Sequence, residues 1–349
     1  MSKLDKYLYK FSKNNKNIYL YKIAYHMVKN NSNSNCQVGG LKPDDTESLI
    51  KFLENLAKSV TVKTEKKYVV ILFGPPASGK SIAKHIAYNI IKEKFDEKES
   101  YDNISKSFID TNIDDITYSV ETNNTTVEQL LKDNISKVLP DLENKPEKRQ
   151  KELVKHKITE LVKTSFGIYQ SNRKRVDIVS ELLYYFSIFL GKNTFIETSS
   201  GDPEYIGKII SSFNFYNYIP ILVYPFTQDV NTLYERSISR GIKQGRFLLC
   251  DGPYGLAKQM TICLENYKKI KQLFDSRQYY CFIQYQSEFT DDMKDKLEKD
   301  DFTGLHDITL EIEYRKLSDV GNNTELVTHY TKNKKYSELT QIKTECNKI

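Results

Sequence analysis

Residues 74–81 read Gly74-Pro75-Pro76-Ala77-Ser78-Gly79-Lys80-Ser81 and match the pattern G-x-x-x-x-G-K-[S/T] at every fixed position. The run Tyr68–Phe73 just before them is entirely apolar, which is typical of a strand buried on both faces. From Ser81 to Phe95, apolar residues recur on one side of a helical pattern. A strand, a glycine-containing loop and a helix in this order predict a phosphate-binding loop.

The two fixed glycines of this loop let the backbone curl, so that successive N–H groups point inward at phosphate oxygens. The helix after the loop presents its positive end to the same anion. Lys80 is expected to bridge the outer phosphates of a nucleoside triphosphate, and the Ser81 hydroxyl is expected to hold Mg²⁺. The predicted nucleotide-binding residues are Gly74, Pro75, Pro76, Ala77, Ser78, Gly79, Lys80, Ser81 and Ile82.

Downstream of the loop, short apolar runs alternate with helical patterns. The predicted strands are Ser107–Asp110, Thr194–Glu197 and Ile219–Tyr224, followed by two more at 278–285 and 307–315. Such alternation favours a parallel sheet with helices on both faces. The expected fold class is α/β: a P-loop NTPase three-layer sandwich with a mostly parallel sheet, plus N-terminal helical and C-terminal α+β extensions.

The chain has 349 residues, and this length predicts about two domains. We assign 1–60 to an N-terminal helical extension and linker, 61–252 to the core that contains the loop, and 253–349 to a C-terminal extension. Residues 121–170 are polar and helical in pattern and are predicted to form an insert within the core.

Three helices are expected in and after this insert. Two cover Thr126–Leu139 and Lys148–Phe166 and are separated by prolines. A third runs from Ser171 and ends at Gly191, because a glycine commonly follows the last turn of a helix.

The loop alone does not separate GTPases, motor ATPases and kinases. No N-K-x-D base reader or D-x-x-G switch occurs in a plausible place, which argues against a GTPase. Phe195-Ile196-Glu197 is only a weak form of the acidic strand that motor ATPases carry. A small-molecule kinase is favoured because Phe108-Ile109-Asp110 places an acid at the tip of the next strand, with Asp114 just beyond.

Three arginines late in the core support the kinase interpretation. Arg236 and Arg240 are four residues apart and share a helix face, and Arg246 follows two glycines that allow a mobile lid. Such arginines can neutralise charge on a transferring phosphoryl group. The alternative is a solvated basic face, which is disfavoured here because a phosphate-binding loop and four strands precede the arginines.

These features together resemble the zeta-toxin family of P-loop kinases over residues 65–250. The matching parts are Gly74–Ser81, the Phe108–Asp110 strand, the run Asn193–Ser199 and the arginine region. The resemblance implies a kinase that uses ATP and Mg²⁺ and phosphorylates a hydroxyl of a small molecule. Bacterial members of the family act on UDP-N-acetylglucosamine.

The resemblance also implies roles for single residues. It implies Lys80 and Ser81 as phosphate and metal ligands, Glu197 and Ser199 as acceptor-binding residues, and Arg240 and Arg246 as catalytic lid arginines, with Lys80 also counted as catalytic. From the residues themselves we add Asp110 as a catalytic residue and metal ligand, and Asp114 and Arg236 as acceptor-binding residues.

One position departs from the family pattern. Its second strand typically ends in Ile-Asp-x-Asp, with the second Asp as general base, whereas Asn112 stands at that position here. An amide does not accept a proton usefully, so Asp110 or, through a shifted loop, Asp114 is the candidate to replace it. Asn112 keeps a non-catalytic ATP-binding interaction protein open as an alternative.

A polynucleotide or nucleoside kinase on the same scaffold is a further alternative.

The net charge of +6 is mild, so it allows anionic ligands without demanding nucleic acid. The clusters Arg173–Arg175 and Lys332–Lys335 are interpreted as solvated faces, and a nucleic-acid partner is not expected. A protein partner at the terminal extensions is left open.

The five cysteines form no C-x-x-C pair, which favours free thiols in a reducing compartment over a disulfide framework. The N-terminus does not resemble a signal peptide, and no apolar stretch reaches about 20 residues. We therefore expect a cytoplasmic protein that does not associate with a membrane.

Overall fold

The computed structural model describes residues 60, 62–94, 98–110, 112, 114, 117–118, 121–122, 125–199, 202–274, 280–286, 309–317, 324–331 and 342–347. The predicted N-terminal helical extension and linker lie almost entirely outside these residues. The other predicted elements can be compared with the structure.

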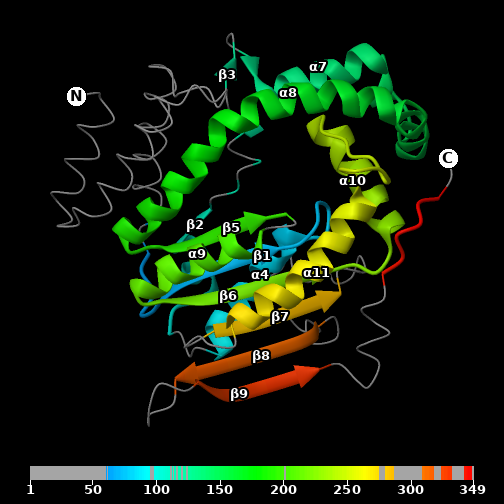
Figure 1. The fold of residues 1–349 in the computed structure, drawn as a ribbon. Helices are drawn as coiled ribbons and strands as arrows, with labels where there is room; N and C mark the ends of the chain where they lie inside the picture. The colour runs from blue at the N-terminus through cyan, green and yellow to red at the C-terminus, as the bar shows by residue number, and fades with distance from the viewer. Residues whose placement is uncertain are drawn as a thin grey trace.

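The strands and helices alternate along the chain (Figure 1). The strands are β1 (Lys67–Phe73), β2 (Phe108–Asp110), β3 (Glu121–Thr122), β4 (Thr125–Thr126), β5 (Asn193–Thr198), β6 (Tyr218–Phe226), β7 (Tyr280–Gln286), β8 (Thr309–Leu317) and β9 (Thr324–Thr331). The helices are α4 (Lys80–Lys94), α5 (Tyr101–Lys106), α7 (Val127–Val138), the 3-10 turn η1 (Leu142–Asn144), α8 (Glu147–Leu190), α9 (Pro203–Phe215), α10 (Val230–Gln244) and α11 (Leu256–Phe274).

Seven strands form one sheet in the order β2-β5-β1-β6-β7-β8-β9. Neighbouring strands from β2 to β7 are parallel, whereas β8 and β9 are antiparallel to their neighbours. The expectation of a mixed α/β fold with a parallel sheet is confirmed. After β1 the chain forms β2 and β5 on one side of β1 in the strand order, and then β6 on its other side. A ligand crevice is expected where the strand order reverses, at the carboxyl end of β1.

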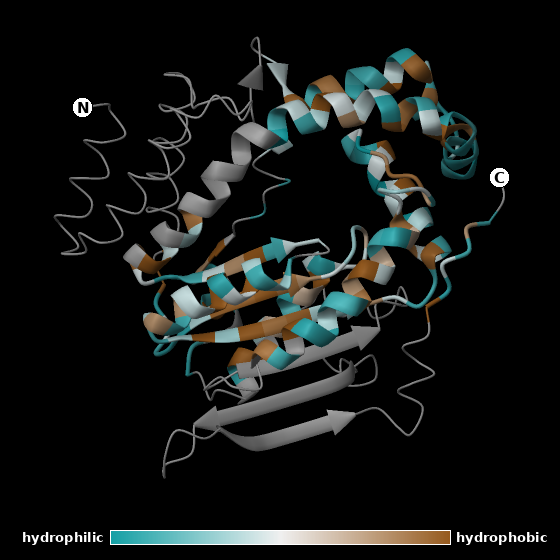
Figure 2. Cartoon of the chain, viewed as in Figure 1, coloured by the Kyte–Doolittle hydropathy of each residue, from teal (hydrophilic) through white to brown (hydrophobic). Residues whose placement is uncertain are grey.

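Side chains of β1 alternate between two apolar clusters, because successive strand residues point to opposite faces. Tyr68 and Leu72 pack with α4, while Ile71 and Phe73 pack with α9 and α11. Hydrophobic residues gather along these central strands (Figure 2). Each such buried side chain stabilises the fold by about 1.5–3 kcal/mol, so the sheet is a firm base for the loop that follows β1.

α8 is one continuous helix of 44 residues. The predicted break between Phe166 and Ser171 is wrong, because Gly167 is the only helix-weakening residue there and costs about 1 kcal/mol. The helix ends before Gly191, as expected. α7 lies along α8 (Figure 1), and both pack against α10, so the predicted helical insert forms an arm beside the core.

The C-terminal residues 342–347 return to the start of α10. The Val230 N–H donates to the Lys343 carbonyl at 2.9 Å, and the Lys343 N–H donates to the Gln228 carbonyl at 2.7 Å. A disulfide joins Cys250 to Cys346. The expectation of free thiols is therefore wrong for this pair, because 96 residues separate the two cysteines and leave no local pattern.

The predicted boundary at residue 252 falls between α10 and α11, and the division into core and extensions stays a prediction. β7, β8 and β9 continue the sheet of the core.

Candidate active site

The Gly74–Ser81 loop leaves the carboxyl end of β1 and is tied to the neighbouring strand. The Gly74 N–H donates to the carbonyl of Thr198, the last residue of β5, at 3.2 Å. Ala77 has a φ of 62°, a left-handed conformation that costs a non-glycine residue about 1–2 kcal/mol. Strain of this kind gathers at functional sites, where the surrounding structure holds it in place.

The side chains of the loop leave polar groups turned inward. The Ser78 hydroxyl is fully buried and has no hydrogen-bond partner among the residues that the structure describes. A Cβ added to Gly74 would lie 3.0 Å from this hydroxyl oxygen, so the position requires glycine. These donors suit an anionic ligand.

α4 begins at Lys80, directly after the loop. The Gly79 carbonyl accepts hydrogen bonds from Ile82 N–H at 3.0 Å and Ala83 N–H at 3.1 Å, which starts the helix. The first N–H groups of a helix have no acceptor within it. The first turn of α4 contains no acidic residue, so its positive end faces the loop without a neutralising side chain.

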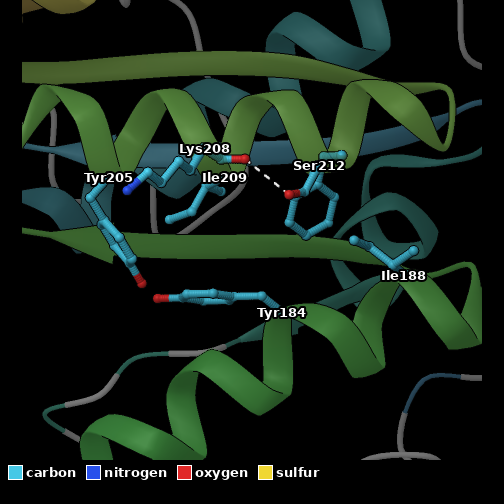
Figure 3. Close-up of a pocket in the computed structure, with 7 residues that line it drawn as sticks. Tyr184, Ile188, Tyr205, Lys208, Ile209 and Ser212 are labelled. Carbon is cyan, nitrogen blue, oxygen red and sulfur yellow. Dashed lines mark hydrogen bonds between the residues drawn. The ribbon is translucent and has the colours of Figure 1, made fainter. Parts of the chain in front are cut away.

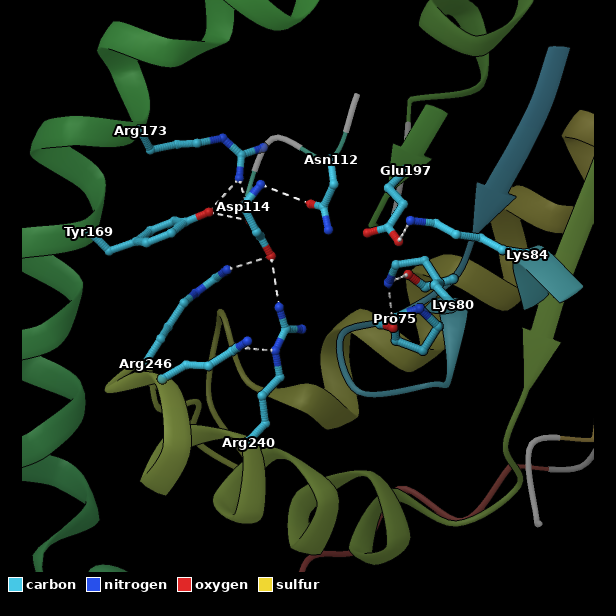
Figure 4. Close-up of polar contacts among 12 residues, drawn as sticks. Pro75, Lys80, Lys84, Asn112, Asp114, Tyr169, Arg173, Glu197, Arg240 and Arg246 are labelled. Atoms are coloured by element: carbon cyan, nitrogen blue, oxygen red, sulfur yellow. Dashed lines mark hydrogen bonds and ion pairs between the residues drawn. The ribbon is translucent and has the colours of Figure 1, made fainter. Parts of the chain in front are cut away.

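Lys80 lies over the loop (Figure 4), where its ammonium group donates to the carbonyls of Gly74 and Pro75, each at 3.0 Å. Burial lowers the pKa of Lys80, while the nearby carboxylate of Glu197 raises it. The ammonium group is thus held beside the backbone that is expected to bind phosphates.

Three further predicted residues lie at the carboxyl ends of strands β5 and β2. Glu197 pairs in register with Leu72, and its carboxylate lies 4.0 Å from the Lys84 ammonium of α4. Ser199 follows β5 and is exposed. Asp110 is the last residue of β2, but its side chain lies outside the described part.

Asp114 is the centre of a polar cluster across from the loop (Figure 4). Its Oδ1 accepts a hydrogen bond from Arg173 Nη1 at 3.0 Å and another from the Tyr169 hydroxyl. Its Oδ2 accepts from Arg246 Nη1 at 3.0 Å and lies 3.5 Å from Arg240 Nη2. The Arg246 guanidinium also lies 4.0 Å from the centre of the Tyr169 ring. Three cations surround one carboxylate, so the cluster carries a net charge of +2.

The cations decide the ionisation of Asp114. Burial would raise the pKa of its carboxyl, but Arg246, the Tyr169 hydroxyl, Arg240 and Arg173 together lower it to about 2. The same carboxylate raises the pKa of Arg246 against the opposing effect of burial. Asp114 therefore stays ionised at any physiological pH and is a weak base.

Asn112 has a local structural contact. Its side-chain oxygen accepts a hydrogen bond from the Asp114 N–H at 3.0 Å. The amide therefore contacts the backbone of the residue at the centre of the polar cluster.

We predict that Asp114→Asn lowers the free energy of unfolding by about 2 kcal/mol at neutral pH, since the pKa of Asp114 shifts from 3.8 to about 2 on folding. The ionised Asp114 stabilises the folded state at pH values above its unfolded pKa of 3.8. This stabilisation is lost as the pH falls through its folded pKa of about 2. Urea unfolding of both proteins between pH 7 and pH 2 measures this. The difference between them should be constant above about pH 5 and shrink below it; a constant difference down to pH 2 contradicts the assignment.

Comparison with known proteins places the chain in a family. The uncharacterized protein L872 of Acanthamoeba polyphaga mimivirus is 47% identical over 310 residues, which cover 88% of each chain. This chain belongs to the L872 family. No protein-family model matches it.

A solved structure from the PezAT chromosomal toxin-antitoxin system of Streptococcus pneumoniae aligns with this L872-family chain with a TM-score of 0.36 and 13% identity. The alignment covers 73% of this chain and 92% of the other. A likeness of this degree supports no conclusion about function.

In this L872-family member, Gly245 positions Arg246. It ends α10 with a φ of 81°, and an added Cβ would lie 2.4 Å from the Cβ of Leu131 in α7. The close approach brings Arg246 toward the arm. Arg236 lies one turn before Arg240 on α10 and is partly buried.

Sequence reasoning missed Tyr169 and Arg173. Arg173 was interpreted as part of a solvated basic face, but its side chain is only 27% exposed and pairs with Asp114. The i, i+4 spacing of Tyr169 and Arg173 on one helix face is the signal that could have linked them. Their contact with Asp114 joins the α7–α8 arm to the site.

A small cavity of about 100 Å³ lies between α8 and α9 (Figure 3). It is lined by Tyr184, Ile188, Tyr205, Lys208, Ile209, Ser212 and Phe213. None of the predicted site residues lines it, so the chemistry is assigned to the loop and the Asp114 cluster.

Among the described helices, none is long and apolar enough to cross a membrane. Within the same part of the chain, no three His, Cys, Asp or Glu side chains are grouped as a metal site would need.

Proposed function

We propose that the protein is an ATP-dependent kinase that transfers the γ-phosphoryl group to a hydroxyl of a small, nucleotide-sugar-like acceptor. The observation that carries this proposal is the placement of Lys80 opposite the arginine cluster. The pKa of Lys80 responds to Glu197, Asp114 and Arg240, so the loop and the cluster share one electrostatic environment. The strand order and the helices on both faces support a P-loop NTPase three-layer sandwich.

In this proposal the chain supplies positioning and charge. Backbone N–H groups of the loop and the Lys80 ammonium bind the outer phosphates. Arg240 and Arg246 face the transferring group and neutralise the charge that develops on it. Mg²⁺, held through Ser81, would neutralise phosphate charge when bound.

We assign the general base to Asp110. Asp114 is unsuitable because its pKa is about 2, three hydrogen-bond donors occupy its oxygens and Arg240 pairs with it. Asp110 ends β2 beside β5, whose end carries Glu197 and Ser199 for the acceptor. The acceptor hydroxyl gives its proton to Asp110, and the acceptor oxygen forms the new bond to the γ-phosphorus. The bond between the γ-phosphorus and the bridging oxygen breaks, and ADP leaves with its electrons.

The test is a transfer assay with the full chain, Mg²⁺ and ATP labelled at the γ-phosphate. Nucleotide sugars, nucleosides and RNA 5′ ends are offered as separate acceptors. We expect label on a nucleotide sugar and about 10²- to 10⁴-fold less in Asp110→Asn. Label on RNA ends or nucleosides alone would instead assign a polynucleotide or nucleoside kinase.

A second candidate is a non-catalytic ATP-binding interaction protein, and Asn112 favours it. The amide stands where the resemblance implies a base and is engaged by the Asp114 backbone. ATP binding that depends on Lys80, without transfer to any of the acceptors, would select this candidate over the kinase.

A further inference from the structure

The Asp114 carboxylate connects parts of the chain that are far apart in sequence. Tyr169 and Arg173 reach it from α8, Arg240 from α10, and Arg246 from the segment after α10. Its side chain is 19% exposed, and both oxygens have two partners. A partly buried carboxylate with three hydrogen-bond donors and one further ion-pair partner fixes the orientation of the groups around it.

The two arginines proposed to act on the phosphoryl group are each held at a second point. Arg240 Nε donates to the Gln244 side-chain oxygen at 2.6 Å, one turn along α10. The Arg246 guanidinium lies over the Tyr169 ring. With Asp114 as the shared partner, both guanidinium groups are oriented before any ligand arrives, which lowers the cost of organising the site.

The partners of Asp114 divide into two sides. Arg240 is near enough to Lys80 to affect its pKa, and Asp114 is as well. Tyr169 and Arg173 share the other carboxylate oxygen, Oδ1, and come from the arm. Contacts therefore run from the arm through the carboxylate to Arg240 and Arg246, and Figure 4 shows this cluster facing Lys80.

We propose that Asp114 is a positioning residue: its carboxylate, held by Tyr169 and Arg173, orients Arg240 and Arg246 toward the γ-phosphoryl group at Lys80. This inference rests on the proposed function and gives Asp114 a role other than acceptor binding. The excess of two positive charges around Asp114 remains for the phosphate oxygens.

A competing role for Asp114 predicts the opposite change in ATP affinity when its charge is removed. If Asp114 occupied the arginines in place of phosphate, removing its charge would free them and strengthen ATP binding. If Asp114 positions them, removing it weakens the binding of the γ-phosphate, although the site becomes more positive.

The experiment compares the Kd values for ATP-Mg²⁺ and ADP-Mg²⁺ by calorimetry, because their ratio isolates the γ-phosphate. We expect wild type to prefer ATP, and Arg240→Ala and Asp114→Asn each to reduce the preference by about tenfold. The double variant should lose no more than either single variant, because one acts through the other. Additive losses, or a stronger preference in Asp114→Asn, overturn the proposal.

Variants on α8 keep the test independent of whether Asp114→Asn folds. Arg173→Ala and Tyr169→Phe are expected to reduce the ATP preference several-fold with the ADP Kd unchanged, and Arg173→Lys to restore part of it. Arg149→Ala is the matched control, since Arg149 lies on the same helix and pairs only with Glu152 at the surface among the described contacts.

An unchanged ATP preference in Arg173→Ala and Tyr169→Phe overturns the positioning role. A loss of ADP and ATP affinity in equal proportion also overturns it, because that reflects a general structural effect. Failure of wild type to bind either nucleotide would instead remove the proposed function itself, so the two failures are distinguishable.

Discussion

Lys80→Ala is expected to lower the rate of phosphoryl transfer by about 10²- to 10³-fold, because it removes the charged donor nearest the proposed phosphates. The fold should be unaffected. Burial lowers the pKa of Lys80, which means that the folded protein holds this ammonium group at a cost. Transfer rate, Kd for ATP-Mg²⁺ and Tm of the variant measure the two effects separately.

Lys151→Ala is a suitable control. Lys151 is a residue of the same type on α8, and it pairs with Glu147 at the surface, where an ion pair contributes about 0–1 kcal/mol. Its transfer rate and Tm should match wild type. A Lys80→Ala protein with wild-type ATP affinity would show that the loop does not bind phosphates.

Cys346→Ser is expected to lower the free energy of unfolding by about 4 kcal/mol, because the disulfide closes a loop of 96 residues. The closed loop reduces the conformational freedom of the unfolded chain, and longer loops lose more of it. Thermal unfolding with and without dithiothreitol measures the effect. Reduced wild type should unfold at the same temperature as the variant.

The double variant Cys250→Ser, Cys346→Ser should be no less stable than Cys346→Ser alone, because either change removes the same bond. Cys346→Ser should also be insensitive to dithiothreitol. A wild-type Tm that does not respond to reduction contradicts a stabilising disulfide at this position.

The strands near the loop could be predicted because their signals are local. Tyr68–Phe73 is an unbroken apolar run, and the structure has β1 there. Polar segments gave weaker signals: β9 was not expected, since Thr324–Thr331 is mostly polar. The break assigned between Phe166 and Ser171 failed because packing of α8 along α7 outweighs the low helix propensity of Gly167.

The roles of the site residues stay predictions. Lys80, Glu197, Asp114 and Arg240 were chosen from motif positions, and the structure brings their charges together. Arg173 could not be found this way, because a basic residue on a polar helix resembles any solvated one until its partner is known. Contacts between distant segments, such as the pairing of Cys250 with Cys346, leave no trace in local spacing.

The length of α8 has a mechanical consequence. Tyr184 and Ile188 anchor its end on the sheet, while Arg173 lies eleven residues earlier, about 16 Å away along the helix. A tilt of α8 by about 10° about this anchored end moves Arg173 by about 3 Å, which is as long as its hydrogen bond to Asp114. A displacement of the α7–α8 arm of this size would therefore be enough to break the hydrogen bond between Arg173 and Asp114.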